Sequence, residues 1–123
     1  MRGLAYFCFL SAILYALIGM AGGIGMAASQ DHILAPAHAH LNLLGFVGFA
    51  IYGLYYHAVP TAAASRLGKL HVAASTLGLW LLIPGVALAI LGVTEGLAII
   101  GSFVTILAMA LFAVVVARNK SAA

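Results

Sequence analysis

Charged side chains are almost missing from this chain of 123 residues. Two acidic and five basic residues make up 6% of it, whereas 66% of the residues are hydrophobic. A soluble domain needs polar side chains to cover its core, and so few charges cannot supply that cover. The composition therefore excludes a soluble enzyme and indicates a membrane protein. Five scattered basic residues also make no basic surface of the kind that binds nucleic acid.

Cysteine and proline are scarce as well. The single cysteine, Cys8, excludes an internal disulfide, and we interpret it as a small apolar residue that packs between helices. Pro36 suits the first turn of a helix, where its missing N–H costs nothing, and Pro60 is expected to end that helix. Pro84 lies within an apolar run and is expected to kink it.

Long hydrophobic runs occupy nearly the whole chain. At about 1.5 Å per residue, each run can cross roughly 30 Å of hydrocarbon as a helix. The first run has the charged start of a signal peptide, but its apolar part is too long, so we expect a retained helix. The sequence predicts an all-α fold: one transmembrane domain spanning 1–123, an integral membrane four-helix bundle made of two antiparallel hairpins. The expected helices are 4–27, 36–58, 70–91 and 97–116.

The few charges predict an orientation. In a four-helix bundle all the basic residues fall on one side: Arg2, Arg66, Lys69, Arg118 and Lys120. Basic residues favour the cytoplasmic side of a membrane, so we expect both termini to be cytoplasmic (N-in and C-in). The only acids, Asp31 and Glu95, then lie in the two outer loops. The expected location is a bacterial-type inner membrane, with the lipid bilayer as surroundings.

Small and aromatic residues give weaker indications of packing. Two glycine pairs stand four residues apart, a spacing that permits close helix approach but also arises by chance: Gly19 with Gly23, and Gly92 with Gly96. Three tyrosines gather near the inner end of the second helix: Tyr52, Tyr55 and Tyr56. We interpret them as an interfacial belt rather than as a cofactor site.

The five histidines are the main candidates for function, because an ionisable residue within a membrane span is costly and usually functional. His32, His38 and His40 are expected near the outer side, and His57 and His71 near the inner side. His40 and His57 are about 25 Å apart along one helix and cannot share a site. His57 and His71 can meet across the inner hairpin. We interpret this inner pair as solvated at the interface, with a structural hydrogen bond or a second metal site left open.

The spacing of His38 and His40 carries more information. Two positions on a helix correspond to about 200° of rotation, so the two imidazoles point to nearly opposite faces and cannot bind one ion together. Each is expected to face its own haem or metal, with the other ligand supplied by another helix or another copy of the chain. His32, in the adjoining loop, can add a ligand to one of them. Asn42 is a candidate to hydrogen-bond a ligand, although it lies on a different face from His40.

The segment His38-Ala-His40-Leu-Asn-Leu-Leu-Gly resembles subunit I of the haem-copper oxidase and nitric oxide reductase superfamily. His40, followed by Leu-Asn-Leu, matches the family's axial histidine for the low-spin haem on helix two. Together with His38 it also matches a His-x-His whose members bind two haems on opposite faces. The resemblance implies haem b held by bis-histidine iron, which suits electron transfer or redox or gas sensing.

The resemblance also implies an assembly. Subunit I of that family has twelve helices in three arcs of four, and one arc has as many helices as this chain is expected to have. A homotrimer would then resemble the parent fold, with His38 of one protomer and His40 of its neighbour on either side of a haem in each cleft. The family's copper centre needs two consecutive histidines, and this chain has no His-His pair. Oxygen reduction by the chain alone is therefore not expected, and enzyme activity stays open.

Two other function classes stay open. A copper or other transition-metal handling protein can use His32, His38 and His40, with soft sulfur ligands from Met20 and Met26. Alternatively, the chain is a non-haem accessory or assembly subunit whose histidines only hydrogen-bond their neighbours. The sequence has no docking domain and no quinone motif that would identify a redox partner.

Overall fold

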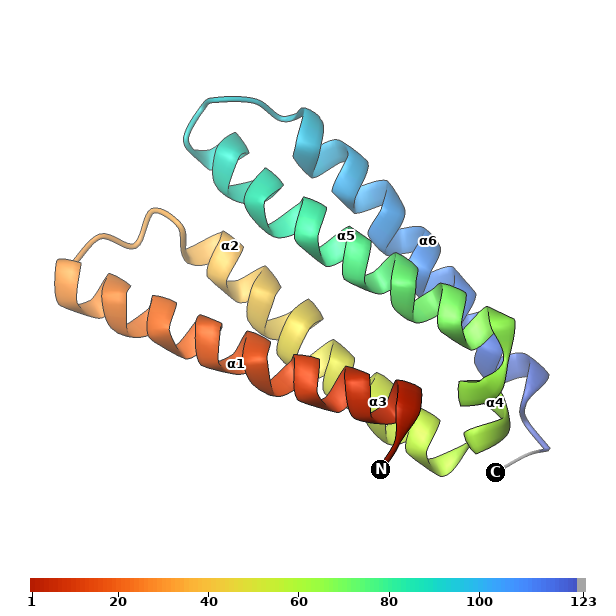
Figure 1. Cartoon of the computed structure of the whole chain (residues 1–123). Coiled ribbons are helices and arrows are strands. Elements are labelled where there is room, and N and C mark those ends of the chain that lie inside the picture. Colours follow the sequence, from red (N-terminus) through yellow and green to blue (C-terminus); the bar gives the residue numbers. More distant parts are fainter. Residues whose placement is uncertain (122–123) are drawn as a thin grey trace.

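The computed structural model describes residues 1–121, and all their regular secondary structure is helical. Four stretches are long and apolar enough to cross a membrane: Gly3–Ser29, Ala35–Ala58, Arg66–Ile90 and Gly96–Arg118. They form two hairpins that lie against each other (Figure 1). The expected all-α fold, with four helices long and apolar enough to span a membrane, is therefore confirmed. The largest difference from the expected bounds is at the third span, which begins at Arg66 rather than Leu70.

The second span is not a uniform α-helix. Its middle is a π-helix, in which backbone hydrogen bonds join residues five apart. A further short helix fills part of the expected inner loop. In chain order the elements are α1 (Gly3–Ser29), α2 (Ala35–His40), η1 (Leu41–Val47), α3 (Gly48–Ala58), α4 (Pro60–Ala64), α5 (Arg66–Ile90) and α6 (Gly96–Arg118). Helix α5 continues through Pro84 as one element.

The helix ends follow from local side-chain chemistry. Gln30 ends α1 in the left-handed region, with φ of 58°. The Asp31 carboxylate then accepts a hydrogen bond from the Ile33 N–H at 3.1 Å and fixes the turn that leads to Pro36 in the first turn of α2. At the other end of the molecule, Ser65 caps α5, because its hydroxyl accepts the Gly68 N–H at 2.9 Å.

Glycine brings the helices of each hairpin into close contact. A Cβ atom at Gly85 of α5 would come within 2.5 Å of the Ala98 backbone nitrogen in α6. A Cβ at Gly53 of α3 would come within 3.0 Å of the Phe9 backbone nitrogen in α1. These positions have no room for a side chain, so backbone packs directly on backbone in both hairpins.

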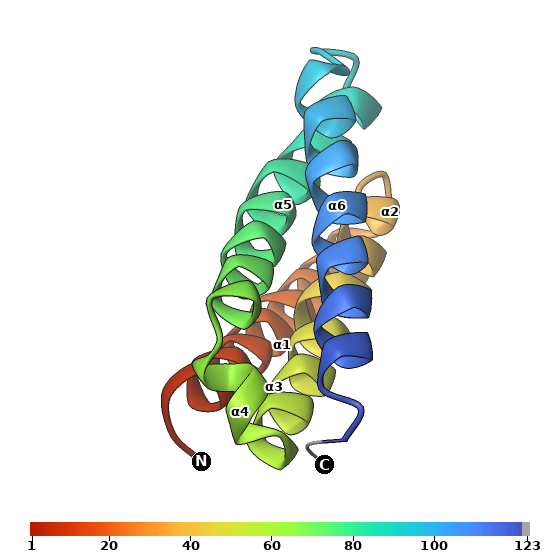
Figure 2. The same ribbon diagram turned by 90° about the vertical axis from the view of Figure 1, so that its right-hand side faces the viewer.

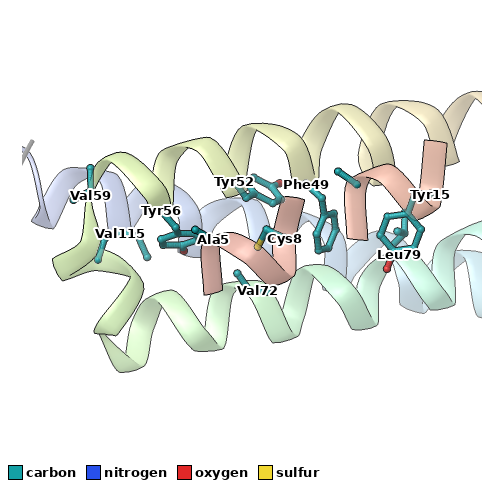
Figure 3. Close-up of a cluster of buried hydrophobic side chains, with 12 residues drawn as sticks. Ala5, Cys8, Tyr15, Phe49, Tyr52, Tyr56, Val59, Val72, Leu79 and Val115 are labelled. Carbon is teal, nitrogen blue, oxygen red and sulfur yellow. The ribbon is translucent and has the colours of Figure 1, made fainter. Parts of the chain in front are cut away.

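Aromatic side chains fill the space between the two hairpins (Figure 3). The Tyr52 ring of α3 lies 4.5 Å from the ring of His71 in α5 and 4.8 Å from that of Phe112 in α6, between centroids. Tyr52 and Tyr56 are only 6% and 1% exposed, so the expectation that they form an interfacial belt is wrong. Cys8 is fully buried in the same core, as expected for a small apolar residue.

The start of α1 and the end of α6 lie at the same end as α4, which we call the terminal end (Figures 1 and 2). The opposite end, the loop end, contains the turn after α1 and the turn before α6. The five basic residues stand at the helix ends and turns of the terminal end, and the two acids stand in the turns of the loop end. The charge separation that the sequence predicted is therefore present along the bundle axis.

Candidate functional site

His40, the last residue of α2, has its ring held from one side only. Its Nδ1 lies 2.6 Å from the carbonyl oxygen of Pro36, one turn back along the helix. A carbonyl oxygen can only accept, so Nδ1 carries a proton, and in the neutral imidazole Nε2 then keeps its lone pair. The His40 side chain is exposed on the surface of the bundle. The ring is therefore held in a fixed orientation on an exposed residue at the loop end of the second apolar stretch.

His38, two residues earlier, lies in a different environment. Its ring is half-buried against α1, where a Cβ at Gly23 would be 3.3 Å from the histidine Cε1. Its Nε2 lies 3.0 Å from Nδ2 of Asn42, whose amide donates to it. The two histidines thus face different surroundings, as their spacing predicted. Asn42 hydrogen-bonds His38 and not His40, also in keeping with its position on the helix.

The two glycine pairs of the sequence have different outcomes. Gly19 and Gly23 lie on α1 directly beneath the Asn42 and His38 side chains, so this pair marks a real contact between α1 and the second span. Gly92 lies in the turn between α5 and α6, and Gly96 is the first residue of α6. Gly92 has φ of +74° and nothing within 4 Å of a Cβ built on it, so that pair marks a turn and not an interface.

The π-helix η1 begins immediately after His40. Segments of this kind occur mostly as short insertions in α-helices, often next to functional sites, because they re-aim the side chains on either side. A regular helix therefore gives the right relative direction for His38 and His40, which both precede η1. For the residues of α3, however, a regular helix gives the wrong direction relative to the two histidines, because the wider turns of η1 rotate all the side chains that follow.

His71 contradicts the expectation of a solvated histidine at the interface. The side chain is fully buried, its Nδ1 lies 2.8 Å from the Tyr56 hydroxyl, and its ring stacks on Phe112 at 4.8 Å. Within the part of the chain described, its Nε2 has no hydrogen-bond partner, and neither has the buried hydroxyl of Ser75 one turn farther along α5. Because α5 begins at Arg66, His71 is more than a turn inside the helix, on the face that packs against α3 and α6.

His57 does not meet His71. It lies in the last turn of α3 on the outside of the bundle, where it is exposed and lines a groove with Arg2 and Lys69. The ring and hydrogen-bond contacts of His71 are with Tyr52, Tyr56 and Phe112. The structural hydrogen bond left open for the inner pair therefore exists, but it joins His71 to Tyr56 and not to His57.

No ready-made metal cluster is found in residues 1–121: nowhere do three His, Cys, Asp or Glu side chains come close enough to hold an ion. His32, His38 and His40 in particular do not gather into one site. A metal at His38 or His40 therefore needs its remaining ligands from a cofactor or from another copy of the chain.

Comparisons of this chain with protein-family models, curated proteins and solved structures found no match. The resemblance to the haem-copper oxidase superfamily therefore rests on the short segment from His38 to Gly45. What the chain does has to be inferred from its own side-chain geometry.

Proposed function

We propose that this chain is a haem b-binding protein of a bacterial-type inner membrane, with His40 as an axial ligand of the iron, suited to electron transfer or redox or gas sensing. One observation carries the proposal: the exposed His40 ring donates its Nδ1 proton to the Pro36 carbonyl at 2.6 Å and leaves Nε2 free. Histidines that bind metals almost always donate the other ring N–H to a carboxylate, carbonyl or water, which fixes the ring and raises its basicity.

The surroundings of His40 fit a haem. The next turn of the span, in η1, presents large apolar side chains outward: Leu43, Phe46 and Val47 are 63%, 43% and 42% exposed. An apolar macrocycle can pack on such a surface. His40 lies five residues into the span, which is roughly 8 Å along the helix axis. A haem held at this depth would have its carboxylates close to the membrane surface, where water can hydrate them.

The second axial ligand is proposed to be His38 of a neighbouring copy, in a homotrimer whose protomers are N-in and C-in. Within one chain His38 and His40 face different surroundings, so two copies are needed to bring one of each to a single iron. His38 would exchange its hydrogen bond with Asn42 for the iron. Haem supplies one-electron redox chemistry, and the ligands, their hydrogen bonds and the apolar shell set its potential.

The test is the visible spectrum of the detergent-purified protein, oxidised and dithionite-reduced, with a pyridine haemochrome assay normalised to chain concentration. We expect sharp reduced α and β bands and about one haem per chain. His40→Ala removes the haem. His38→Ala keeps the haem but converts it to a high-spin form, because one axial ligand is lost. His57→Ala, a histidine at the opposite end, serves as the control and leaves the spectrum unchanged. Protein without a Soret band, purified from cells supplied with haem, would contradict the proposal.

A further inference from the structure

A groove opens between the start of α1 and the start of α5 at the terminal end. Its volume is about 800 Å³, and the charged and ionisable side chains that line it are Arg2, His57 and Lys69. Phe7 and Tyr56 provide apolar wall next to them. Three cationic or protonatable groups from three separate parts of the chain therefore line one space at the terminal end of the bundle.

An apolar section continues from this groove along the surface of the bundle. A second section, of about 740 Å³, shares Leu4, Phe7 and Lys69 with the first and runs along α5 as far as Trp80. The one hydroxyl in this section, that of Thr76, is turned onto its own helix, where it donates to the Val72 carbonyl at 2.8 Å. The section beyond Lys69 therefore presents apolar surface.

The length of the apolar section matches one leaflet of a bilayer. Lys69 and Trp80 are eleven residues apart on α5, which corresponds to roughly 16 Å along the helix axis. Half of the hydrocarbon thickness of a bilayer is about 15 Å. A chain that starts at the basic end of the groove and reaches Trp80 thus spans one leaflet.

Within the part of the chain that the structure describes, the basic groups of the groove have no acidic side chain beside them. The only two acids, Asp31 and Glu95, lie in the turns of the loop end, on the far side of the bundle. Arg2 and Lys69 therefore leave an uncompensated positive charge where the apolar section begins. Basic pockets between membrane helices are sites for anionic lipid headgroups.

We propose that this groove binds one anionic phospholipid, with its phosphate against Arg2 and Lys69 beside His57 and one acyl chain along α5 to Trp80. A lipid without net charge matches only the apolar section, through its acyl chain, and a soluble phosphate matches only the basic end, through its negative charge. An anionic lipid satisfies both, and this complementarity of charge and length selects it.

The experiment counts lipids that stay bound to the purified protein, by native mass spectrometry after exchange into detergent mixed with phosphatidylglycerol or phosphatidylcholine. We expect about one phosphatidylglycerol per chain and little phosphatidylcholine. The double variant Arg2→Gln/Lys69→Gln should weaken phosphatidylglycerol binding about thirtyfold, since each basic group near the surface contributes about a fivefold effect. Glycerol phosphate, which has the headgroup charge without the chain, should not compete at equal concentration.

Two control variants separate this site from general attraction to the membrane. Arg118→Gln/Lys120→Gln removes the same charge from the same end of the molecule but outside the groove, and it should retain the lipid. Ala73→Trp fills the apolar section without changing the charge and should expel the lipid. Equal losses in the two charge variants, equal retention of the two lipids, or displacement by glycerol phosphate would each overturn the proposal. Circular dichroism of every variant verifies that the helices remain folded.

Discussion

Tyr56 and His71 form the one hydrogen bond between polar side chains of α3 and α5 within the described residues, at 2.8 Å in a buried core. Tyr56→Phe leaves the His71 Nδ1 buried without this partner. A buried polar atom that loses its partner costs about 1–3 kcal/mol, so we expect a loss of stability of that size. Unfolding in mixed micelles with increasing denaturing detergent measures it.

The adjacent Tyr55 provides the matched control. Its ring packs on Phe112 at 5.2 Å between centroids, but its hydroxyl makes none of the hydrogen bonds of the core. Tyr55→Phe removes the same oxygen atom and is expected to leave stability nearly unchanged. Equal effects of the two substitutions would show that the Tyr56 hydroxyl contributes nothing specific to His71.

The sequence predicted some residue environments and missed others for a definite reason. The opposite directions of His38 and His40 follow from their spacing on one helix, so they could be predicted without knowing which helices pack beside them. The burial of His71 depends on where α5 begins and on which residues of α3 lie opposite it. Tyr56 and His71 are fifteen positions apart, on either side of the connection between α3 and α5. The short helix α4, which begins at Pro60, and the Ser65 cap set the register of α5 against α3, and hydropathy alone does not locate either of them.

At the scale of the elements, close packing of α5 on α6 depends on glycine. Gly85→Ala places a Cβ within 2.5 Å of the Ala98 backbone nitrogen, and backbone cannot yield as a flexible side chain can. We expect the variant to lose about 1–3 kcal/mol of stability or to separate the hairpin. Thermal unfolding followed by circular dichroism measures the change.

Gly25, near the end of α1, is the control for the same substitution. A Cβ built there meets nothing within 4 Å, so Gly25→Ala adds a methyl group without a clash. Alanine favours a helix over glycine by about 1 kcal/mol, and the variant should be as stable as the parent or more stable. If both variants are equally stable, the tight contact at Gly85 is not important for the hairpin.

The number and approximate length of the four long apolar stretches were predictable, because hydropathy and the bilayer thickness determine them. The π-helix η1 was not predictable, because Leu41–Val47 carries no composition that separates a π-helix from an α-helix. Its packing also depends on neighbouring helices that are far away in the sequence. Gly45 within η1 illustrates this: a Cβ there would lie 3.0 Å from that of Tyr15 in α1. Such a contact exists only once α1 and η1 are side by side.

At the scale of the whole molecule, the proposed haem site requires more than one copy of the chain. Native mass spectrometry or light scattering in a mild detergent is expected to give three chains per particle. A ring of identical head-to-tail interfaces closes at such a number, and each interface would bring one His38 toward one His40. Particles containing only one or two chains would contradict the trimer, and single chains would also leave the second axial ligand without a source.

The most direct test of the central claim is chemical rescue of His40. His40→Gly removes the ligand and leaves a space that free imidazole can enter, while the partners of His38, Asn42 and Gly23, are untouched. The account predicts that the variant purifies without haem and that added haem restores sharp α and β bands only when imidazole is also present. Two results would contradict the assignment of His40 as the iron ligand. One is restoration of the bands by haem alone, and the other is a purified His40→Gly variant with the same haem spectrum as the unsubstituted protein.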